Sequence, residues 1–97
     1  MRRGDFVTVA LQGDFGKPRP ALVIQADKFD AHATVTVLLV SSLLIDAPLF
    51  RITVQPDATN RLKQPSQIMV DKAMTVKRDR LGEPFGAASD EVMLEIG

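Results

Sequence analysis

The sequence contains no cysteine, no tryptophan and no tyrosine, and it has a single histidine, His32. Without thiols the chain forms no disulfide, no thiolate metal site and no cysteine nucleophile, a composition that fits a reducing cytoplasm. One histidine excludes a zinc site built from several histidines of the same chain, and a Ser-His-Asp triad would have to include His32. Because His32 lies between two strand signals, we expect it to be a loop residue.

The sequence also has no long apolar run. No segment approaches the roughly 20 apolar residues that a membrane-spanning helix needs, and Met1-Arg2-Arg3 is followed by Gly4-Asp5 and only a short apolar strand, unlike a signal peptide. We therefore expect no membrane segment.

The net charge is zero, because the 12 basic side chains balance the 12 acidic ones, but residues 61–80 are mainly basic whereas residues 83–95 carry only acidic charges. Such a basic segment favours nucleic-acid binding weakly, and a solvated surface is the simpler alternative.

The 97 residues, of which 45% are hydrophobic and 25% charged, predict one globular domain over residues 1–97 with one modest core. Most apolar residues lie in short segments rich in β-branched side chains, separated by residues typical of turns. Phe50 to Val54 alternates strictly and so places its apolar side chains on one face. The predicted strands span residues 6–11, 21–26, 34–40, 50–54, 67–70 and 74–76, and the last two are either separate strands or one bent strand.

Helix is predicted only near the end of the chain. Ser89 is a suitable N-cap, and Asp90 and Glu91 place negative charge in the first turn. The predicted helix is about eight residues long, which is marginal unless its apolar side packs on something. We therefore expect either that the chain is a fragment lacking the rest of this helix or that a partner subunit covers the apolar side, formed by Val92, Met93 and Ile96. Several strands with one terminal helix predict a mainly β fold, a small and strongly curved antiparallel barrel or half-barrel.

A cation stands between two prolines directly before an apolar strand, in the segment Lys17-Pro18-Arg19-Pro20. Each proline fixes its own φ and pushes the preceding residue towards extended conformations, so Arg19 has little backbone freedom. A guanidinium held at the edge of a sheet is a pre-set fork for a phosphate or carboxylate group. The alternative is an ordinary strand start whose arginine only reaches solvent.

A wider pattern runs in order along almost the whole chain. It consists of Arg3-Gly4-Asp5-Phe6, the Gly-x-x-Arg-Pro motif within residues 16–25, the strand end Val40-Ser41-Ser42, the segment from Ser66 to Thr75, and Arg80-Leu81. This pattern resembles the MazF/PemK (Kid) toxins of bacterial type II toxin–antitoxin systems. The resemblance implies an SH3-like barrel of the MazF/CcdB kind that forms a homodimer. It also implies a sequence-specific endoribonuclease that cleaves single-stranded messenger RNA without a metal or other cofactor, stops translation and growth, and is neutralised by a cognate antitoxin.

The resemblance assigns three catalytic residues. The arginine of Gly-x-x-Arg-Pro is catalytic in these toxins and corresponds to Arg19. Ser41 stands where a catalytic threonine is usual, so the hydroxyl is kept while the methyl group that would restrict its rotamer is lost. Asp71 matches an acidic residue that takes part in catalysis in some members, although Lys72 replaces the glutamine of that pattern. This departure, together with the short loop before Arg19, points to a different base preference.

The implied reaction can be matched to these side chains. Cleavage of RNA without a metal requires that the 2′-hydroxyl attack the adjacent phosphorus, which leaves a 2′,3′-cyclic phosphate. Arg19 suits the stabilisation of the extra charge on the phosphorane, but a guanidinium is a poor general base. We therefore assign Ser41 as a hydrogen-bond positioner and Asp71 as a participant in proton transfer.

Four further residues are predicted RNA contacts. Lys17, Lys72 and Ser66 would hold phosphates or base edges, and Phe15 would stack on an unpaired base. Each prediction has a structural alternative, since Phe15 would also serve as a loop plug, Lys72 as a solvated cation and Ser66 as a turn hydroxyl. With only five aromatic residues in the chain, all phenylalanine, stacking is limited and a short recognition site is expected.

Two non-enzymatic functions stay open at this point. The same fold would serve a CcdB-like toxin that acts by binding DNA gyrase, in which case Arg19 would be dispensable for toxicity. The second is an SH3-like binding module or a toxin relative without activity, in keeping with the short terminal helix. The Arg19-Pro20 signature favours the ribonuclease over both.

Overall fold

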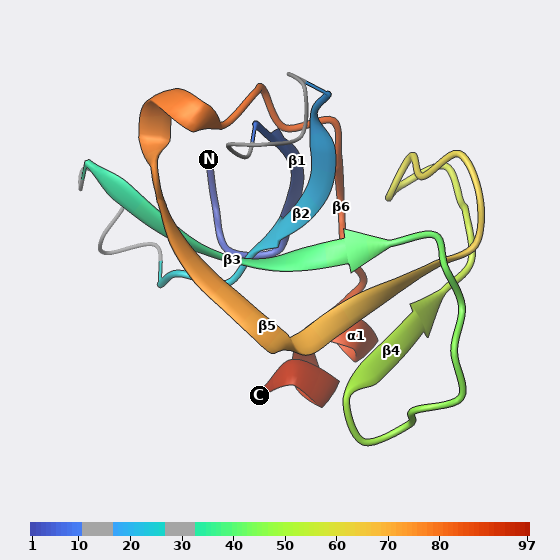
Figure 1. Ribbon diagram of the computed structural model, residues 1–97. Coiled ribbons are helices and arrows are strands. Elements are labelled where there is room, and N and C mark those ends of the chain that lie inside the picture. Colours follow the sequence, from blue (N-terminus) through green and yellow to red (C-terminus); the bar gives the residue numbers. More distant parts are fainter. Residues whose placement is uncertain (11–16, 27–32) are drawn as a thin grey trace.

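The computed structural model describes residues 1–10, 17–26 and 33–97, and within these ranges the chain forms one six-stranded antiparallel sheet (Figure 1). A 3₁₀ turn, η2 (Arg78–Arg80), and a helix, α1 (Asp90–Ile96), lie in the last quarter of the chain. In space the strands follow the order β4-β5-β3-β2-β1-β6. Their bounds are β1 (Asp5–Val9), β2 (Arg19–Val23), β3 (Thr34–Ser41), β4 (Arg51–Val54), β5 (Ser66–Lys77) and β6 (Gly86–Ala87). This confirms the prediction of a mainly β fold with a terminal helix.

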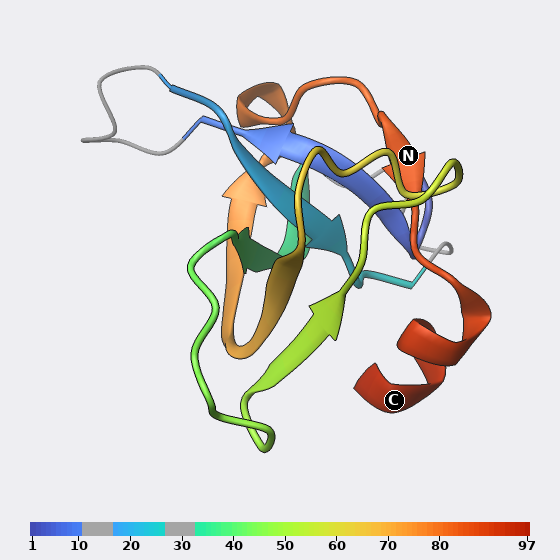
Figure 2. The same ribbon diagram turned by 90° about the vertical axis from the view of Figure 1, so that its right-hand side faces the viewer.

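The sheet curls strongly (Figures 1 and 2), and apolar side chains are buried on both of its faces. Successive residues of a strand point to opposite faces, yet Phe6 and Val7 of β1 are both fully buried. The Phe6 cluster lies on one face and comprises Phe6, Leu22, Leu38, Val40, Val54, Leu62 and Ile68. The Val7 cluster lies on the other and comprises Val7, Val9, Ala21, Val23, Val35, Val37 and Val76. Each face of the curled sheet therefore buries its own apolar cluster.

The second strand begins earlier than predicted. Residues 21–26 were expected to form it, whereas β2 starts at Arg19 and ends at Val23. Arg19 and Pro20 pair with Val9 and Thr8 of β1, because the two prolines already hold this segment in the extended conformation that pairing requires. Arg19 is thus the first residue of a strand.

The predicted strands at residues 67–70 and 74–76 are one bent strand, β5. Val40 of β3 pairs with Ile68 of β5 and Leu38 pairs with Ala73, so residues 69–72 stand opposite Leu39 alone. These extra residues interrupt the ladder and bend the strand, as β-bulges do. Figure 1 shows the bend at the lowest point of β5.

Helix α1 has the cap and the apolar side that the sequence predicts. The Ser89 hydroxyl accepts a hydrogen bond from the Val92 N–H at 3.2 Å, and Gly97 closes the helix in a left-handed conformation at φ 92°. Its apolar residues Val92, Met93 and Ile96 pack against the Phe6 cluster of the same chain. The chain's own core therefore covers part of this side of the helix. Within the described ranges no helix is long and apolar enough to cross a membrane.

The loop between β4 and β5 is fastened by a buried amide, Asn60, which is 2% exposed. Its side-chain oxygen accepts from the N–H groups of Asp57 and Leu62, and its side-chain nitrogen donates to the Gln55 carbonyl. The loop then lies so close to β6 that a Cβ added at Gly86 would come within 2.1 Å of the Asn60 carbonyl oxygen. The short strand β6 was not predicted from the sequence, because only this packing and its pairing with β1 define it.

Candidate active site

Arg19 and Ser41 stand at the ends of two neighbouring strands. The pairing of β2 with β3 reaches Ala21 and Leu39, and Arg19 and Ser41 each lie two residues beyond this pair on the same side of it. Beyond the pair the two strands diverge, β2 towards the top of Figure 1 and β3 towards its right-hand side. Arg19 is exposed and Ser41 is partly exposed. We call these two residues the strand-end site.

The Ser41 hydroxyl is oriented by the turn that follows it. Its oxygen accepts a hydrogen bond from the Leu43 N–H at 3.0 Å, the contact typical of a serine that starts a turn. Because the oxygen is the acceptor in this bond, the hydroxyl proton stays available to an acceptor such as a phosphate oxygen. Ser41 can therefore act as a hydrogen-bond donor at the strand-end site.

Gln67, which was not predicted as a site residue, lies on β5 directly opposite Ser41 of β3. It is 5% exposed, and its side-chain amide bonds the loop that follows Ser41. A long polar side chain at the start of an otherwise apolar strand segment is the only sequence signal that marks it. Its burial became visible only once β3 and β5 were paired.

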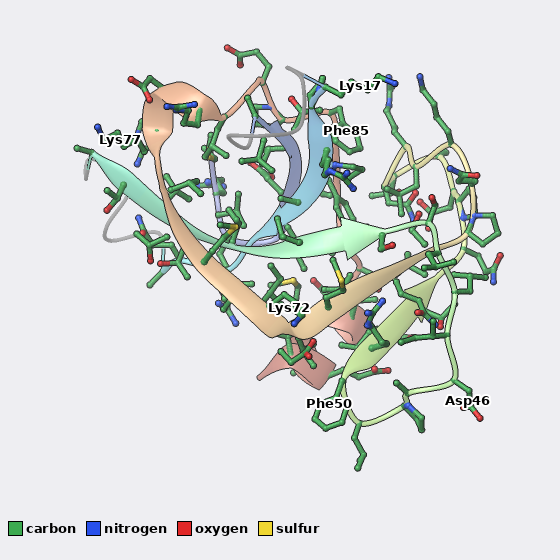
Figure 3. All side chains as sticks on the ribbon, viewed as in Figure 1. Lys17, Asp46, Phe50, Lys72, Lys77 and Phe85 are labelled. Carbon is green, nitrogen blue, oxygen red and sulfur yellow. The ribbon has the colours of Figure 1, made fainter. Side chains whose placement is uncertain are left out.

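A small pocket of about 150 Å³ opens beside Gln67. Its walls come from the β3–β4 loop on one side and from strands β4 and β5 on the other. Arg51 and Asp46 give it one positive and one negative group, and Figure 3 shows Asp46 on the outer side of that loop. The residues lining it are Ile45, Asp46, Ala47, Pro48, Arg51, Thr53 and Gln67.

Asp71 and Lys72 are exposed at the bend of β5. Figure 3 shows Lys72 at the bottom of that strand, whereas the start of β2 lies at the top, and Figure 2 also places the two segments at opposite ends. The strand between them is β3. Within one chain the structure therefore brings Arg19 and Ser41 to neighbouring strand ends but does not bring Asp71 to Arg19.

The remaining residues predicted to contact RNA differ in how exposed they are. Lys17 is exposed and precedes β2, and Figure 3 shows it at the top, near the start of that strand. Ser66 is 5% exposed and its hydroxyl donates to the Gln64 carbonyl at 2.9 Å, which matches its alternative as a turn hydroxyl. Phe15 and His32 lie outside the described residues.

The loop from Ser41 to Phe50 carries unusually large apolar side chains at the surface. Five of its residues are between 43% and 84% exposed, which is more apolar surface than a single loop usually presents. They are Leu43, Leu44, Ile45, Leu49 and Phe50. Packing therefore contributes little to holding this loop.

Together, the small curled antiparallel half-barrel and an arginine and a hydroxyl at the ends of two neighbouring strands define a small β protein whose candidate site offers a cation and a hydrogen-bond donor, the groups that bind a phosphodiester. Residues 2–97 match the family described as the PemK-like, MazF-like toxin of type II toxin–antitoxin systems, and the chain belongs to this family. The resemblance seen in the sequence is thereby confirmed.

Individual relatives agree with this assignment. A probable endoribonuclease MazF of Mycolicibacterium smegmatis is 44% identical over 95 residues, which cover 97% of this chain and 87% of that protein. The Mycobacterium tuberculosis toxin MazF-mt6 superimposes with a TM-score of 0.78 at 22% identity, over 95% of this chain and 86% of that one. The MazE–MazF crystal structure of Deinococcus radiodurans superimposes with a TM-score of 0.76 at 23% identity, over 99% of this chain and 86% of that one. These two solved structures support the fold.

Proposed function

We propose that this chain is an endoribonuclease toxin that cleaves single-stranded messenger RNA at short specific sequences without a metal ion, and so stops translation. The observation that carries the proposal is the match along residues 2–97 to the toxin family, with Arg19 and Ser41 on neighbouring strand ends. The name of the relative that is 44% identical, a probable endoribonuclease, supports the same activity.

In the proposed reaction the ribose 2′-oxygen forms a bond to the adjacent phosphorus while the bond from phosphorus to the 5′-oxygen breaks. The products are a 2′,3′-cyclic phosphate and a 5′-hydroxyl, because the proton lost by the 2′-hydroxyl is balanced by one gained at the 5′-oxygen. The Arg19 guanidinium would bind two phosphate oxygens and stabilise the charge that builds up on them. The Ser41 hydroxyl would donate a hydrogen bond to the same group.

Asp71 is the proposed partner in proton transfer, and its position places a condition on that role. Since the bend of β5 lies far from the start of β2 in one chain, Asp71 can act on a phosphate at Arg19 only if it comes from a second copy of the chain. The catalytic assignment of Asp71 is therefore tied to the proposed homodimer.

Six large apolar side chains at the described surface support such a dimer and a bound antitoxin. They are Leu43, Leu44, Ile45, Leu49, Phe50 and Leu94. Light scattering across micromolar concentrations should give the mass of two chains, and a monomer throughout would rule the dimer out. A neighbour of the same fold was solved in complex with its cognate antitoxin, so we expect the antitoxin of this chain to block cleavage when added in equal amount.

Cleavage itself is tested with long single-stranded RNA in the presence of EDTA. We expect cuts at a short recurring sequence, fragments that end in 2′,3′-cyclic phosphates, and no cut where the ribose before the scissile bond is 2′-deoxy. Intact RNA across varied sequences, with protein shown to be folded by circular dichroism, would contradict the proposal. A pull-down of DNA gyrase with toxicity unchanged in Arg19→Ala would instead favour the CcdB-like alternative.

A further inference from the structure

The buried amide of Gln67 fastens the loop that follows Ser41. Its oxygen accepts from the Ile45 N–H at 3.1 Å, and its nitrogen donates to the Ile45 carbonyl at 2.9 Å and to the Thr53 hydroxyl at 3.1 Å. Both amide hydrogens are thus engaged, so Gln67 has no donor left to bind a nucleobase. Its hydrogen bonds instead indicate that Gln67 holds the loop that follows Ser41 against strand β4.

The fastened segment is short and begins at the catalytic hydroxyl. Ser41 pairs with Gln67 in the β3–β5 register and accepts from the Leu43 N–H, and two residues later Gln67 bonds both backbone groups of Ile45. The position of the Leu43 N–H decides how the Ser41 oxygen is oriented, and it depends on where Ile45 is held. The segment from Ser41 to Ile45, which we call the bracket, is therefore held at Ser41 by strand pairing and at Ile45 by the Gln67 amide.

Packing does not replace this polar anchor. Leu43, Leu44 and Ile45 are 72%, 49% and 43% exposed, so the bracket gains little from burying its own side chains. If the amide were lost, the Ile45 backbone groups would exchange their partner for water and the bracket would take up other conformations. Small misplacements of this kind are enough to lower catalytic rates strongly.

We propose that Gln67 is a positioning residue for Ser41, acting through the backbone of Ile45 and the turn at Leu43. This inference rests on the proposed ribonuclease function. Gln67 touches no reacting atom, so its effect must pass through the Ser41 hydroxyl and disappear when that hydroxyl is absent.

A double-mutant cycle measures this dependence. Gln67→Met keeps the length of the side chain and removes all three hydrogen bonds, and its rate of single-turnover cleavage is compared with that of wild type. We expect the rate to fall about 10- to 100-fold when Ser41 is present and less than about threefold in a Ser41→Ala background. The affinity for an uncleavable 2′-deoxy RNA should change less than about threefold, because no RNA contact is removed.

A matched control separates positioning from general loss of stability. Asn60→Ala also removes a buried amide that fastens a loop, but this loop lies between β4 and β5 and does not contain Ser41. Its effect on cleavage should be the same with and without the Ser41 hydroxyl. If Gln67→Met proves unfolded, Thr53→Val removes only one of the three bonds and should give a smaller loss of rate with the same dependence on Ser41.

Hydrogen exchange gives a readout that needs no RNA. The Leu43 and Ile45 amides should exchange faster in Gln67→Met, while the Leu62 amide, held by Asn60, should not change. Provided that the wild type cleaves RNA, the positioning role alone would be overturned by either of two results. One is a double-mutant cycle in which the two effects are additive, and the other is a Gln67→Met variant with full activity. A folded wild type that cleaves no RNA would overturn the proposed function, and the positioning role of Gln67 in cleavage would be lost with it.

Discussion

Arg19 begins β2 where Ser41 ends the neighbouring strand β3, each two residues beyond the pair formed by Ala21 and Leu39. A guanidinium and a hydroxyl are thereby carried on two neighbouring strands of one sheet, where Arg19 pairs with Val9 of β1 and Ser41 pairs with Gln67 of β5. Preorganised donors of this kind stabilise a developing charge without reorganising during the reaction. The first two predictions test each member of this pair.

Arg19→Ala should lower the rate of RNA cleavage about 10² to 10³-fold, as loss of one charge-stabilising donor does elsewhere. Arg19→Lys should recover only part of the rate, because an ammonium cannot bind two phosphate oxygens as a fork. Single-turnover cleavage at saturating protein measures both. Lys77→Ala is the control, since Lys77 is exposed at the other end of the sheet from Lys17 in Figure 3. Equal losses in Arg19→Ala and Lys77→Ala would mean that Arg19 contributes only charge.

Ser41→Ala should slow cleavage by about tenfold or more, while Ser41→Thr should keep or raise the rate. Threonine retains the hydroxyl, and its β-branch restricts χ1. The comparison uses the same RNA and reports the rate and the affinity separately. A threonine variant as slow as the alanine variant would show that the hydroxyl is not the group that matters.

Asp71→Asn and Arg19→Ala should complement each other if the site is shared between two copies. Each variant alone should be nearly inactive, whereas an equal mixture that has exchanged subunits should regain about a quarter of wild-type activity, because half of the dimers then carry one intact site of two. Cleavage measured before and after subunit exchange gives the result. Two inactive variants that stay inactive when mixed would exclude a shared site, and an active Asp71→Asn would exclude Asp71 from catalysis.

Gly86→Ala should destabilise the fold by about 1–3 kcal/mol, since the new Cβ would meet the Asn60 backbone oxygen, which cannot turn aside. Gly82→Ala is the matched control, because its Cβ would meet the Thr8 hydroxyl, a side-chain group that can rotate away. Urea denaturation should therefore give a clearly smaller loss for Gly82→Ala. Equal losses at both positions would contradict the close approach of the β4–β5 loop to β6.

Much of the fold could be predicted from local signals. The β-branched run at Thr34 to Val40, the strict alternation at Phe50 to Val54 and the capping serine at position 89 each gave the correct element, because each reflects a preference of the local chain. The two prolines around Arg19 likewise predicted an extended cation at a strand edge. The family pattern predicted a hydroxyl residue at a strand end, and Ser41 is the last residue of β3.

Other features depended on partners distant in the sequence. The length of β6 follows from its pairing with Asp5 and Phe6, and the bend of β5 follows from four residues standing opposite one. The buried Gln67 could not be recognised, since its burial requires β3, β4 and the loop between them to close around it. The apolar side of α1 was expected either to belong to a longer helix or to be covered by a partner subunit, and the chain's own core covers part of it.

The sequence by itself determined the kind of protein and the chemistry it carries: a curled β domain, a proline-held arginine and a hydroxyl at a strand end. Only the tertiary structure decided which of these groups lie at neighbouring strand ends, because strand register and bends are set by pairing between residues far apart in the chain. That pairing placed Gln67 behind Ser41 and separated Asp71 from Arg19 within one chain.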